Sequence, residues 1–551
     1  MRIVSQRGGR PRWLVGVFIV LTLSLLGLAA TQSSAALGTT DISTTNDLEI
    51  GENDFRISDM GSDGGTSTGA RRPQVAYNST DNEYLAVWVG QDEPNGPFTI
   101  YAQRIDAATG EEVGENDIRV SQIGNDDEIN DLFFEPGPDV AYNSSTNQYL
   151  VVWGAEISQG SDLPSLYGIY GQRLDAATGD AVGDDDFRID EDAEPDDSDY
   201  RPSNPAVTYN STDDEYFVVW QSNLAEDRSF EIVGQRLSST GTRVGTNEFF
   251  ISDMGPEQDE DRRFNAEQPS VAYNPTDNEY MVVWSGDDNI APLVDNAREI
   301  FGQRLAGATG TEVGDNDFRI STTGPDGNID FNAFRPAVAY NSTASEYLVA
   351  WSGGFDSEFN ALEYKIFIQQ LSAAGEELGG DVLISMEEEV IGFWADYPSA
   401  VYNPTDNEYM VIWSLENIIG GPEVDREYEV YGQRLDGTTG AEVGDDNFRV
   451  SDMGPEEERN YKPFDAAIAY NSRDNEYLAV WSGDDDIDPS VGREREIFGQ
   501  RLDGQPEPPP TPTPTDPPAT ATPTATPPSA TPTPTPEVPP VDSTFLPLII
   551  R

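Results

Sequence analysis

The amino-acid sequence predicts an all-β fold in which seven four-stranded antiparallel sheets form a ring, a seven-bladed β-propeller. Two observations predict this fold. A fourteen-residue segment, first met as "VAYNSTDNEYLAVW", recurs about every 65 residues and is marked each time by its tryptophan: Trp88, Trp153, Trp220, Trp284, Trp351, Trp413 and Trp481. The array also begins with a single strand and ends with three, and these partial repeats together complete one sheet.

The repeated segment is expected to form the first two strands of each sheet. Tyr84, Ala86 and Trp88 fall on one side of a strand and Leu85 and Val87 on the other, so both sides are apolar and both must be covered. The residues "NSTDN" between the two strands are typical of a tight turn.

Four of these turns satisfy the N-glycosylation sequon, at Asn78, Asn143, Asn210 and Asn341. In two other repeats a proline, Pro275 or Pro404, blocks the sequon, and the last repeat has arginine where it needs serine or threonine. Since every repeat keeps the asparagine, we expect that the asparagine serves the turn rather than a glycan.

The third and fourth strands are expected at "IYGQRL" and "VGDNDFRIS". Arginine recurs in both of these strands. A residue repeated in most sheets suits ion pairs or stacking between blades better than catalysis, because one active site needs one arrangement. The fifth repeat departs from the pattern, with "IFIQQL" at 366–371 and "GGDVLIS" in place of "DFRIS". This reading covers two series of arginines: Arg104, Arg173, Arg236, Arg304, Arg434 and Arg501, and Arg56, Arg119, Arg188, Arg319 and Arg449.

Closure of the ring depends on the two ends of the array. The segment from Leu48 to Ser58 is an isolated fourth strand, and the last repeat stops after its third strand at Gly504. We therefore expect the N-terminal strand to complete the last sheet, as in a closed propeller, whereas a linear solenoid would carry polar caps instead.

With "YLVVW", "IYGQRL" and "FRIS" repeated in this order, the chain resembles a family of exported bacterial β-propeller repeats, mostly without assigned activity. The resemblance extends over residues 48–504. It implies the propeller fold and does not imply a particular activity.

The segments outside the repeats predict an exported protein. Residues 1–36 read as a signal peptide, with arginines before an apolar run, and 37–47 as a linker to the propeller at 48–504. Residues 505–540 are a Pro/Thr-rich stalk, and 541–551 are a short apolar tail that resembles a terminal "YLPLxxR" tag of some bacterial secreted proteins. We expect a protein that is secreted, or retained at the cell surface through the stalk and tail.

Composition excludes several kinds of chemistry. The chain has no cysteine and no histidine, so disulfides, thiolate nucleophiles and histidine-based triads or zinc sites cannot be built from it. Its formal net charge of −68 disfavours nucleic acid and anionic lipid as partners. We expect a monomer without an integral membrane span in the mature chain, whose partner is an extracellular glycan or protein.

The candidate ligand-binding residues are aromatic. The long, acidic connections lie on the face where the innermost strands begin, and loops on a rigid scaffold commonly bind ligands. Aromatic rings beside carboxylates suit sugar recognition, although they suit loop packing equally well. The candidates are Trp394, Tyr397, Tyr200, Phe334 and Tyr461.

Calcium is the one metal for which the sequence offers candidates. Two segments, "GPDGNIDF" and "GDDDID", place several oxygen donors within a few residues, although neither has the EF-hand spacing. The candidate ligands are Asp326, Asn328, Asp330, Asp484, Asp486 and Asp488.

The main functional hypothesis from the sequence is an extracellular or cell-surface binding or adhesion module. The alternative is a carbohydrate-active enzyme, a glycosidase or lyase, that uses aspartate or glutamate at the central opening. Catalysis by a glycosidase needs two carboxylates at a set separation, and a chain with 100 acidic residues offers such pairs by chance. The sequence therefore favours the non-enzymatic hypothesis and assigns no catalytic residue.

Overall fold

The computed structural model divides the chain into two units, Met1–Thr45 and Asn46–Arg551. Only residues of the second unit are described, and the following concerns that unit alone. The structure describes residues 48–60, 69–91, 96–123, 137–157, 166–190, 200–223, 229–254, 264–287, 297–325, 328–356, 362–385, 394–418, 426–453, 462–484 and 495–504. Within these ranges there is no helix long and apolar enough to cross a membrane.

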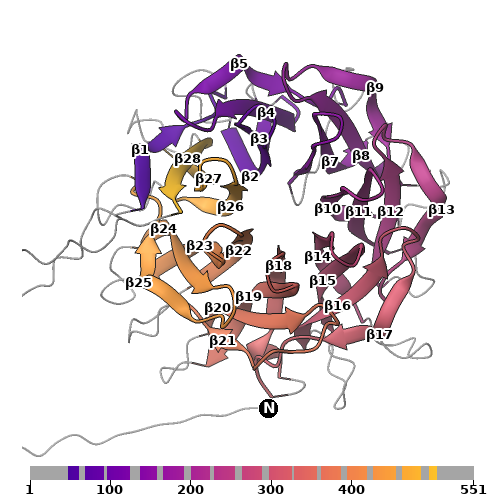
Figure 1. Cartoon of the computed structure of the whole chain (residues 1–551), viewed down its shortest axis with the longest axis vertical. Helices are drawn as coiled ribbons and strands as arrows, with labels where there is room; N and C mark the ends of the chain where they lie inside the picture. Colours follow the sequence, from indigo (N-terminus) through magenta and orange to yellow (C-terminus); the bar gives the residue numbers. More distant parts are fainter. Residues whose placement is uncertain are drawn as a thin grey trace, which may run out of the picture. The chain divides into compact units, whose positions relative to one another are not determined.

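The described residues form an all-β propeller, in which the strands lie around a central opening (Figure 1). The strands labelled nearest the opening are β2 (Gly69–Asn78), β10 (Ser203–Asn210), β14 (Ala266–Asn274), β18 (Ala333–Asn341), β22 (Trp394–Asn403) and β26 (Phe464–Asn471). The equivalent strand β6 (Asp139–Asn143) is the first strand of the sheet β6-β7-β8-β9. A 3₁₀ turn, η1 (Ile329–Phe331), precedes β18.

Three further strands follow each innermost strand outward. The second strands are β3 (Glu83–Gln91), β7 (Gln148–Ile157), β11 (Glu215–Ser222), β15 (Glu279–Asp287), β19 (Glu346–Asp356), β23 (Glu408–Ile418) and β27 (Glu476–Asp484). The third strands are β4 (Thr99–Asp106), β8 (Leu166–Asp175), β12 (Glu231–Ser238), β16 (Arg298–Ala306), β20 (Leu362–Ser372), β24 (Arg426–Asp436) and β28 (Arg495–Asp503). The outer strands are β1 (Glu49–Arg56), β5 (Glu112–Arg119), β9 (Ala181–Arg188), β13 (Arg243–Phe250), β17 (Glu312–Arg319), β21 (Val382–Leu383) and β25 (Glu442–Arg449).

Backbone pairing groups the described strands into three four-stranded sheets and two eight-stranded sheets. Each eight-stranded sheet contains two antiparallel sets joined by one parallel residue pair, Gly69 with Arg495 or Tyr364 with Trp394. The N-terminal strand β1 pairs antiparallel with β28, as the two partial repeats predict.

The core lies between neighbouring sheets. All seven repeat tryptophans have at most 1% of their surface exposed. Each apolar cluster mixes residues of adjacent repeats, as where Trp153 packs with Val87 and Val89. Every second strand is therefore covered on both sides, which explains its unbroken apolar sequence.

The four-residue turns are built by their asparagine. In the fourth repeat the Asn274 carboxamide oxygen accepts hydrogen bonds from the amides of Thr276 (2.9 Å) and Asp277 (3.1 Å), and its side chain is fully buried. The same pair of bonds recurs in the other six turns. The asparagines of the sequons are equally buried, so they serve the turn.

The arginines of the "QRL" strands are paired within their own sheet. Arg304 contacts Glu279 of the preceding strand at 2.6 Å. It also donates to the carbonyl of Ala374, in the next repeat, at 3.1 Å. We had expected ion pairs or stacking between blades, and the structure places the ion pair within one blade because Glu279 lies nearly opposite Arg304 on the paired strands.

A second repeated unit buries a glutamate at the start of the third strand. Glu299 accepts hydrogen bonds from Ser321 and from Arg319 (2.5 Å), and the hydroxyl of Ser321 accepts from the amide of Ile300 (2.7 Å). Corresponding glutamates are Glu231, Glu429 and Glu496. Burial raises the pKa of Glu299 to about 7 and that of Glu231 to about 8.

The fifth repeat, whose sequence departs from the others, also departs in structure. Its outer strand β21 has two residues, where the other outer strands have eight. Lys365 occupies the position of the buried glutamate, and Leu383 takes the position of the arginine that pairs with it. Both partners of the charge pair have therefore changed together.

Candidate functional site

Six of the seven innermost strands share a β-bulge near their N-terminal ends. In β18 the register with β19 shifts between Phe334 and Ala337, and Arg335, inside the shift, has φ +53°. A left-handed conformation at a residue without glycine's freedom, directly before proline, is strained. The same conformation recurs at Arg72, Asn204, Gln268, Tyr397 and Asp465, with φ between +55° and +59°.

These bulges line a cavity of about 550 Å³ whose wall is built from all seven innermost strands. The backbone geometry of the bulge repeats, but the side chain that it carries changes from strand to strand. In the second repeat the position is Gly137, where an added Cβ would lie 2.7 Å from the Cβ of Arg72 and 2.8 Å from its carbonyl oxygen. Because the backbone geometry is the same but the side chains differ, a repeated scaffold can form a single asymmetric site.

Hydrogen bonds connect successive bulges. The carboxamide oxygen of Gln221 accepts from Asn204 and from the amide of Gln268 (2.9 Å). The carboxamide oxygen of Gln268 in turn accepts from the amide of Arg335 (3.0 Å), whose guanidinium forms an ion pair with Asp396. The side chains facing the cavity are thus held by one another.

Arg335 is the most closely surrounded residue of this wall. Its guanidinium lies 4.0 Å from the ring centre of Tyr397 and 5.4 Å from that of Phe334. Its partner Asp396 accepts two further hydrogen bonds of 2.9 Å, from the Ser352 hydroxyl and the Tyr397 amide. These contacts fix the guanidinium at the edge of the cavity.

Asp465 lies at the bulge of β26 and faces the same cavity. Burial raises its pKa, whereas the positive charges of Arg72, Arg495 and Arg335 lower it. The negative charge of Asp396 also raises the pKa of Asp465. Burial has the larger effect, so the pKa of Asp465 lies above the ordinary value of aspartate and the three arginines only partly offset the rise.

Asp139 is a second carboxylate of the wall, at a position where the other repeats have Gln, Ser or Ala. Its oxygens accept hydrogen bonds from the amides of Val207 (2.7 Å) and Val140 (2.8 Å). Burial raises the pKa of Asp139 to about 6, even though both amide bonds lower it. At neutral pH a small fraction of Asp139 is protonated, and this fraction grows on mild acidification.

An aromatic cluster adjoins the cavity at the fifth and sixth repeats. The ring of Tyr364 meets Phe334 edge to face at 4.9 Å and Trp394 at 5.7 Å. Trp394 is 52% exposed, so this cluster offers an open ring surface next to Arg335.

The structure brings together three of the five aromatic candidates predicted from the sequence. Tyr397 lines the cavity, and Phe334 and Trp394 belong to the adjoining cluster. Tyr200 is buried, with its hydroxyl donating to Asp190 at 2.8 Å, which suits the packing alternative. Tyr461 lies outside the described residues.

The calcium candidates fall partly outside the described chain, namely Asp326, Asp486 and Asp488. Of the others, Asn328 caps η1 by accepting from the amide of Asp330 (3.1 Å), and Asp484 is buried at the end of β27. In the part of the chain that the structure describes, no three acidic side chains are grouped so as to hold a metal ion.

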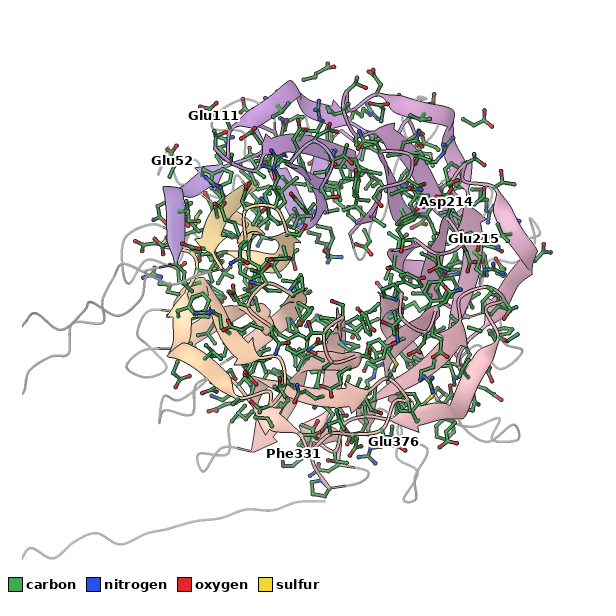
Figure 2. The ribbon with its side chains drawn as sticks, in the orientation of Figure 1. Glu52, Glu111, Asp214, Glu215, Phe331 and Glu376 are labelled. Carbon is green, nitrogen blue, oxygen red and sulfur yellow. The ribbon has the colours of Figure 1, made fainter. Side chains whose placement is uncertain are left out.

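Much of the acidity of the repeats faces solvent, away from this site. Glu52 of β1 is exposed, and Glu111 and Glu376 are exposed in the links to the outer strands. Figure 2 shows these three side chains at the outer rim, pointing away from the central opening. The cavity wall, where arginines and aspartates alternate with amides, is thus chemically distinct from the rim.

Comparison with known proteins finds likeness at the level of structure. No protein-family model and no curated protein matches the chain. It is similar to an α-L-arabinanase from Penicillium chrysogenum complexed with arabinobiose, with 13% identity, 68% of this chain and 93% of that chain covered, and a TM-score of 0.40. The α-L-arabinofuranosidase Arb93A from Fusarium graminearum has 11% identity, coverage of 83% and 98%, and a TM-score of 0.38. The β-propeller domain of the Trilobed protease from Pyrococcus furiosus has 9% identity, coverage of 79% and 93%, and a TM-score of 0.39.

These comparisons correct the main functional hypothesis drawn from the sequence. A binding or adhesion module was expected, but two of these three similar structures, and others among the matches, are propeller glycosidases. A carbohydrate-active enzyme was the alternative hypothesis from the sequence. The sequence pointed the other way because the strong similarity of its repeats hides a small difference between them, the residue at each bulge. Which residues and which substrate are involved has to come from the chain's own cavity, since likeness at this identity concerns the fold alone.

Proposed function

We propose that this chain is a carbohydrate-active enzyme, a glycosidase or lyase, that acts on a glycan in the cavity at the central opening. The observation that carries the proposal is the cavity wall, in which two carboxylates of different environment, Asp139 and Asp465, face one space among fixed polar side chains. Pairs of carboxylates whose surroundings differ are what acid and base roles require.

Asp139 suits the role of the acid. Its pKa of about 6 keeps a useful fraction protonated near neutral pH. Among the described residues, the hydrogen bonds to its oxygens come from the backbone amides of Val207 and Val140, which carry no net positive charge. An acid poised near the working pH transfers a proton most effectively.

Asp465 suits the role of the base, because Arg72, Arg335 and Arg495 partly offset the effect of burial, which raises its pKa. In hydrolysis, Asp139 would give its proton to the glycosidic oxygen as the bond to the anomeric carbon breaks. A water molecule would attack that carbon and pass its proton to Asp465. The products are two shorter sugars, one with a new reducing end.

The test uses the propeller with its natural flanking segments and a panel of neutral and acidic polysaccharides. We expect new reducing ends, or the ultraviolet absorbance of an unsaturated product if the reaction is an elimination. Asp139→Asn and Asp465→Asn should each lower the rate by about 100-fold or more, the usual contribution of an acid or base. Asp139→Ser is the matched fold control, since serine occupies this position at Ser270 and Ser399.

Activity should fall as the pH rises above about 6, because the acid form of Asp139 is then lost. Full activity in Asp139→Asn, or no cleavage of any glycan by a correctly folded chain, would reject the proposal.

We also propose that the ring has seven blades. In each eight-stranded sheet, one parallel residue pair joins the two antiparallel sets. Within each set, neighbouring strands pair along most of their lengths. Dividing both sheets at these pairs turns five sheets into seven units of four strands, with β1 completing the unit of β26 to β28.

The proposed place of action is outside the cytoplasm. The arginine-led apolar segment before residue 36 and the Pro/Thr stalk after residue 505 support this location. A polysaccharide substrate is consistent with it, because such polymers are met outside the cell membrane.

A further inference from the structure

We propose that the cavity selects an anionic saccharide, and that Arg72 and Arg335 bind its acidic group. This inference rests on the proposed function and adds the class of substrate. The shared chemistry is an acidic oxygen group on a sugar, either the carboxylate of a uronic acid or a sulfate ester.

The basic residues of the described chain fall into two groups. Most arginines of the two repeated series are used by the scaffold, where they pair with glutamates of the same sheet or with the buried glutamates. Many of the other described basic residues gather where the innermost strands begin: Arg71, Arg72, Arg201, Arg335 and Lys462. These five basic residues lie within a few residues of the start of an innermost strand.

Several of these cations lie on aromatic rings, which fix a cation in place without adding a negative charge. Arg71 lies 3.8 Å from the ring centre of Phe98, and Arg201 lies 5.1 Å from that of Tyr167. Lys462 lies 5.2 Å from the ring centre of Tyr428. The result is a collar of oriented positive charge at the start of the innermost strands.

Arg72 and Arg335 differ from the rest of the collar because they line the cavity itself. Among the described residues, only Asp396 accepts a hydrogen bond from the guanidinium of Arg335, at Nη1. A guanidinium has five N–H donors, so donors on Nε and Nη2 can serve a second anion. The bulge conformation, strained for arginine, holds this side chain toward the cavity.

The charge of the whole protein does not oppose this binding at physiological salt. At about 0.15 M ionic strength the screening length is about 8 Å, so the distant rim carboxylates are largely screened while groups inside the cavity are not. For a ligand within reach of them, the two wall arginines act at close range beside the wall carboxylates Asp139 and Asp465, whereas the field of the rim is weak. At low salt the rim should repel the same ligand and slow its arrival.

The exposed aromatic cluster fits an oligosaccharide longer than one unit. Trp394 is open to solvent and is linked through Tyr364 to Phe334, which lies next to Arg335. A sugar next to the one held by Arg335 could stack its apolar face on Trp394.

The test compares matched pairs of ligands by calorimetry at about 0.15 M salt. One pair is trigalacturonate and its fully methyl-esterified form, and the other is a sulfated oligosaccharide and its unsulfated parent. We expect the acidic member of one pair to bind at least about tenfold more tightly than its neutral partner, as expected for a charge-assisted hydrogen bond. The pair that shows the preference tells carboxylate from sulfate.

The variants separate the cavity arginines from the collar. Arg72→Gln and Arg335→Gln should each weaken binding of the acidic ligand by about tenfold and leave the neutral ligand unchanged. Arg201→Gln, on the same face but outside the cavity wall, is the control and should bind like the wild type. If Arg335→Gln lowers the melting temperature because Asp396 loses its partner, the double variant Arg335→Gln with Asp396→Asn removes both charges and takes its place.

Each outcome decides the proposal. Equal or tighter binding of the neutral ligands, or wild-type binding by both Arg72→Gln and Arg335→Gln, would overturn the anionic preference while glycan cleavage could stand. Failure of the folded protein to bind or cleave any saccharide would overturn the proposed function and this inference together.

Discussion

The two ends of the innermost strands differ in what they keep constant. At the C-terminal end, each strand finishes in the same asparagine, buried and bonded to the same two amides of the following turn. At the N-terminal end six strands share one strained backbone shape but carry Arg, Asn, Gln, Arg, Tyr and Asp. The comparison teaches that one end of this scaffold specifies the fold, whereas the other end uses the fold to place side chains that differ.

The largest expected effect on stability comes from the constant end. Asn274→Ala removes the acceptor of two turn amides and a buried donor to Asp277 (3.1 Å), so we expect the free energy of unfolding to fall by about 3 kcal/mol. Urea denaturation measures the change. Pro275→Ser, which puts the residue of the other repeats at the exposed next position, should change it by only about 0.5 kcal/mol.

The free energy of unfolding, measured in the same way, also tests the variable N-terminal end of the innermost strands. Asn204→Gly relieves the positive φ while it loses one side-chain hydrogen bond, so the free energy of unfolding should change by less than about 1 kcal/mol. A loss as large as that of Asn274→Ala would show that both ends support the fold alike.

A smaller effect concerns pH and the buried glutamates. Burial raises the pKa of Glu231 and Glu429 to about 8 and that of Glu299 and Glu496 to about 7. A glutamate with a raised folded-state pKa stabilises the fold most below its unfolded pKa, and this stabilisation is lost as the pH rises through 7 to 8. Each such group changes the free energy of unfolding by at most about 1.4 kcal/mol per pH unit.

We therefore expect the melting temperature to rise as the pH is lowered from 8.5 to 6, and scanning calorimetry measures this change. Weaker repulsion among surface carboxylates acts in the same direction, so Glu231→Gln is the control that isolates one buried group. This variant should have a flatter pH dependence than the wild type. An unchanged slope would show that surface charge alone sets the trend.

A last effect concerns a repeat that has the buried glutamate but lacks its arginine. Phe250 stands where five other outer strands carry arginine, is 49% exposed, and lies on the strand next to that of Glu231. Phe250→Arg should lower the pKa of Glu231 and stabilise the protein by about 1 kcal/mol at pH 8, with less gain at pH 6. Arg319→Phe, the reverse change at Glu299, should lose a similar amount by the same thermal assay.

The fold was predictable because the repeats report it many times. The two-sided apolar strands, the asparagine turn and the pairing of β1 with β28 all follow from periodicity, turn chemistry and the partial repeats. The partners of the repeated arginines were harder to predict from the sequence. The distance between Glu279 and Arg304 depends on strand register, which the sequence alone does not specify.

The site was only partly predictable. Tyr397, Phe334 and Trp394 were candidates because they are aromatic, but Arg72, Arg335, Asp139 and Asp465 were hidden among similar charged residues. The signal that could have found most of them is the proline that follows a variable residue at one fixed distance before six of the seven repeated asparagines, the exception being Ala466 after Asp465. Reading it required knowing that the bulge turns that residue toward the centre, and this orientation is a property of the folded ring.

The repeated bulge has a consequence for how such a protein acquires a new specificity. Because the backbone already accepts Arg, Asn, Gln, Tyr and Asp at equivalent places, single codon changes there can alter the ligand without disturbing packing or turns. Gene duplication multiplies the scaffold, and divergence then needs to alter only one position per copy. A small library randomised at the bulge codons would therefore sample new recognition surfaces on an unchanged frame.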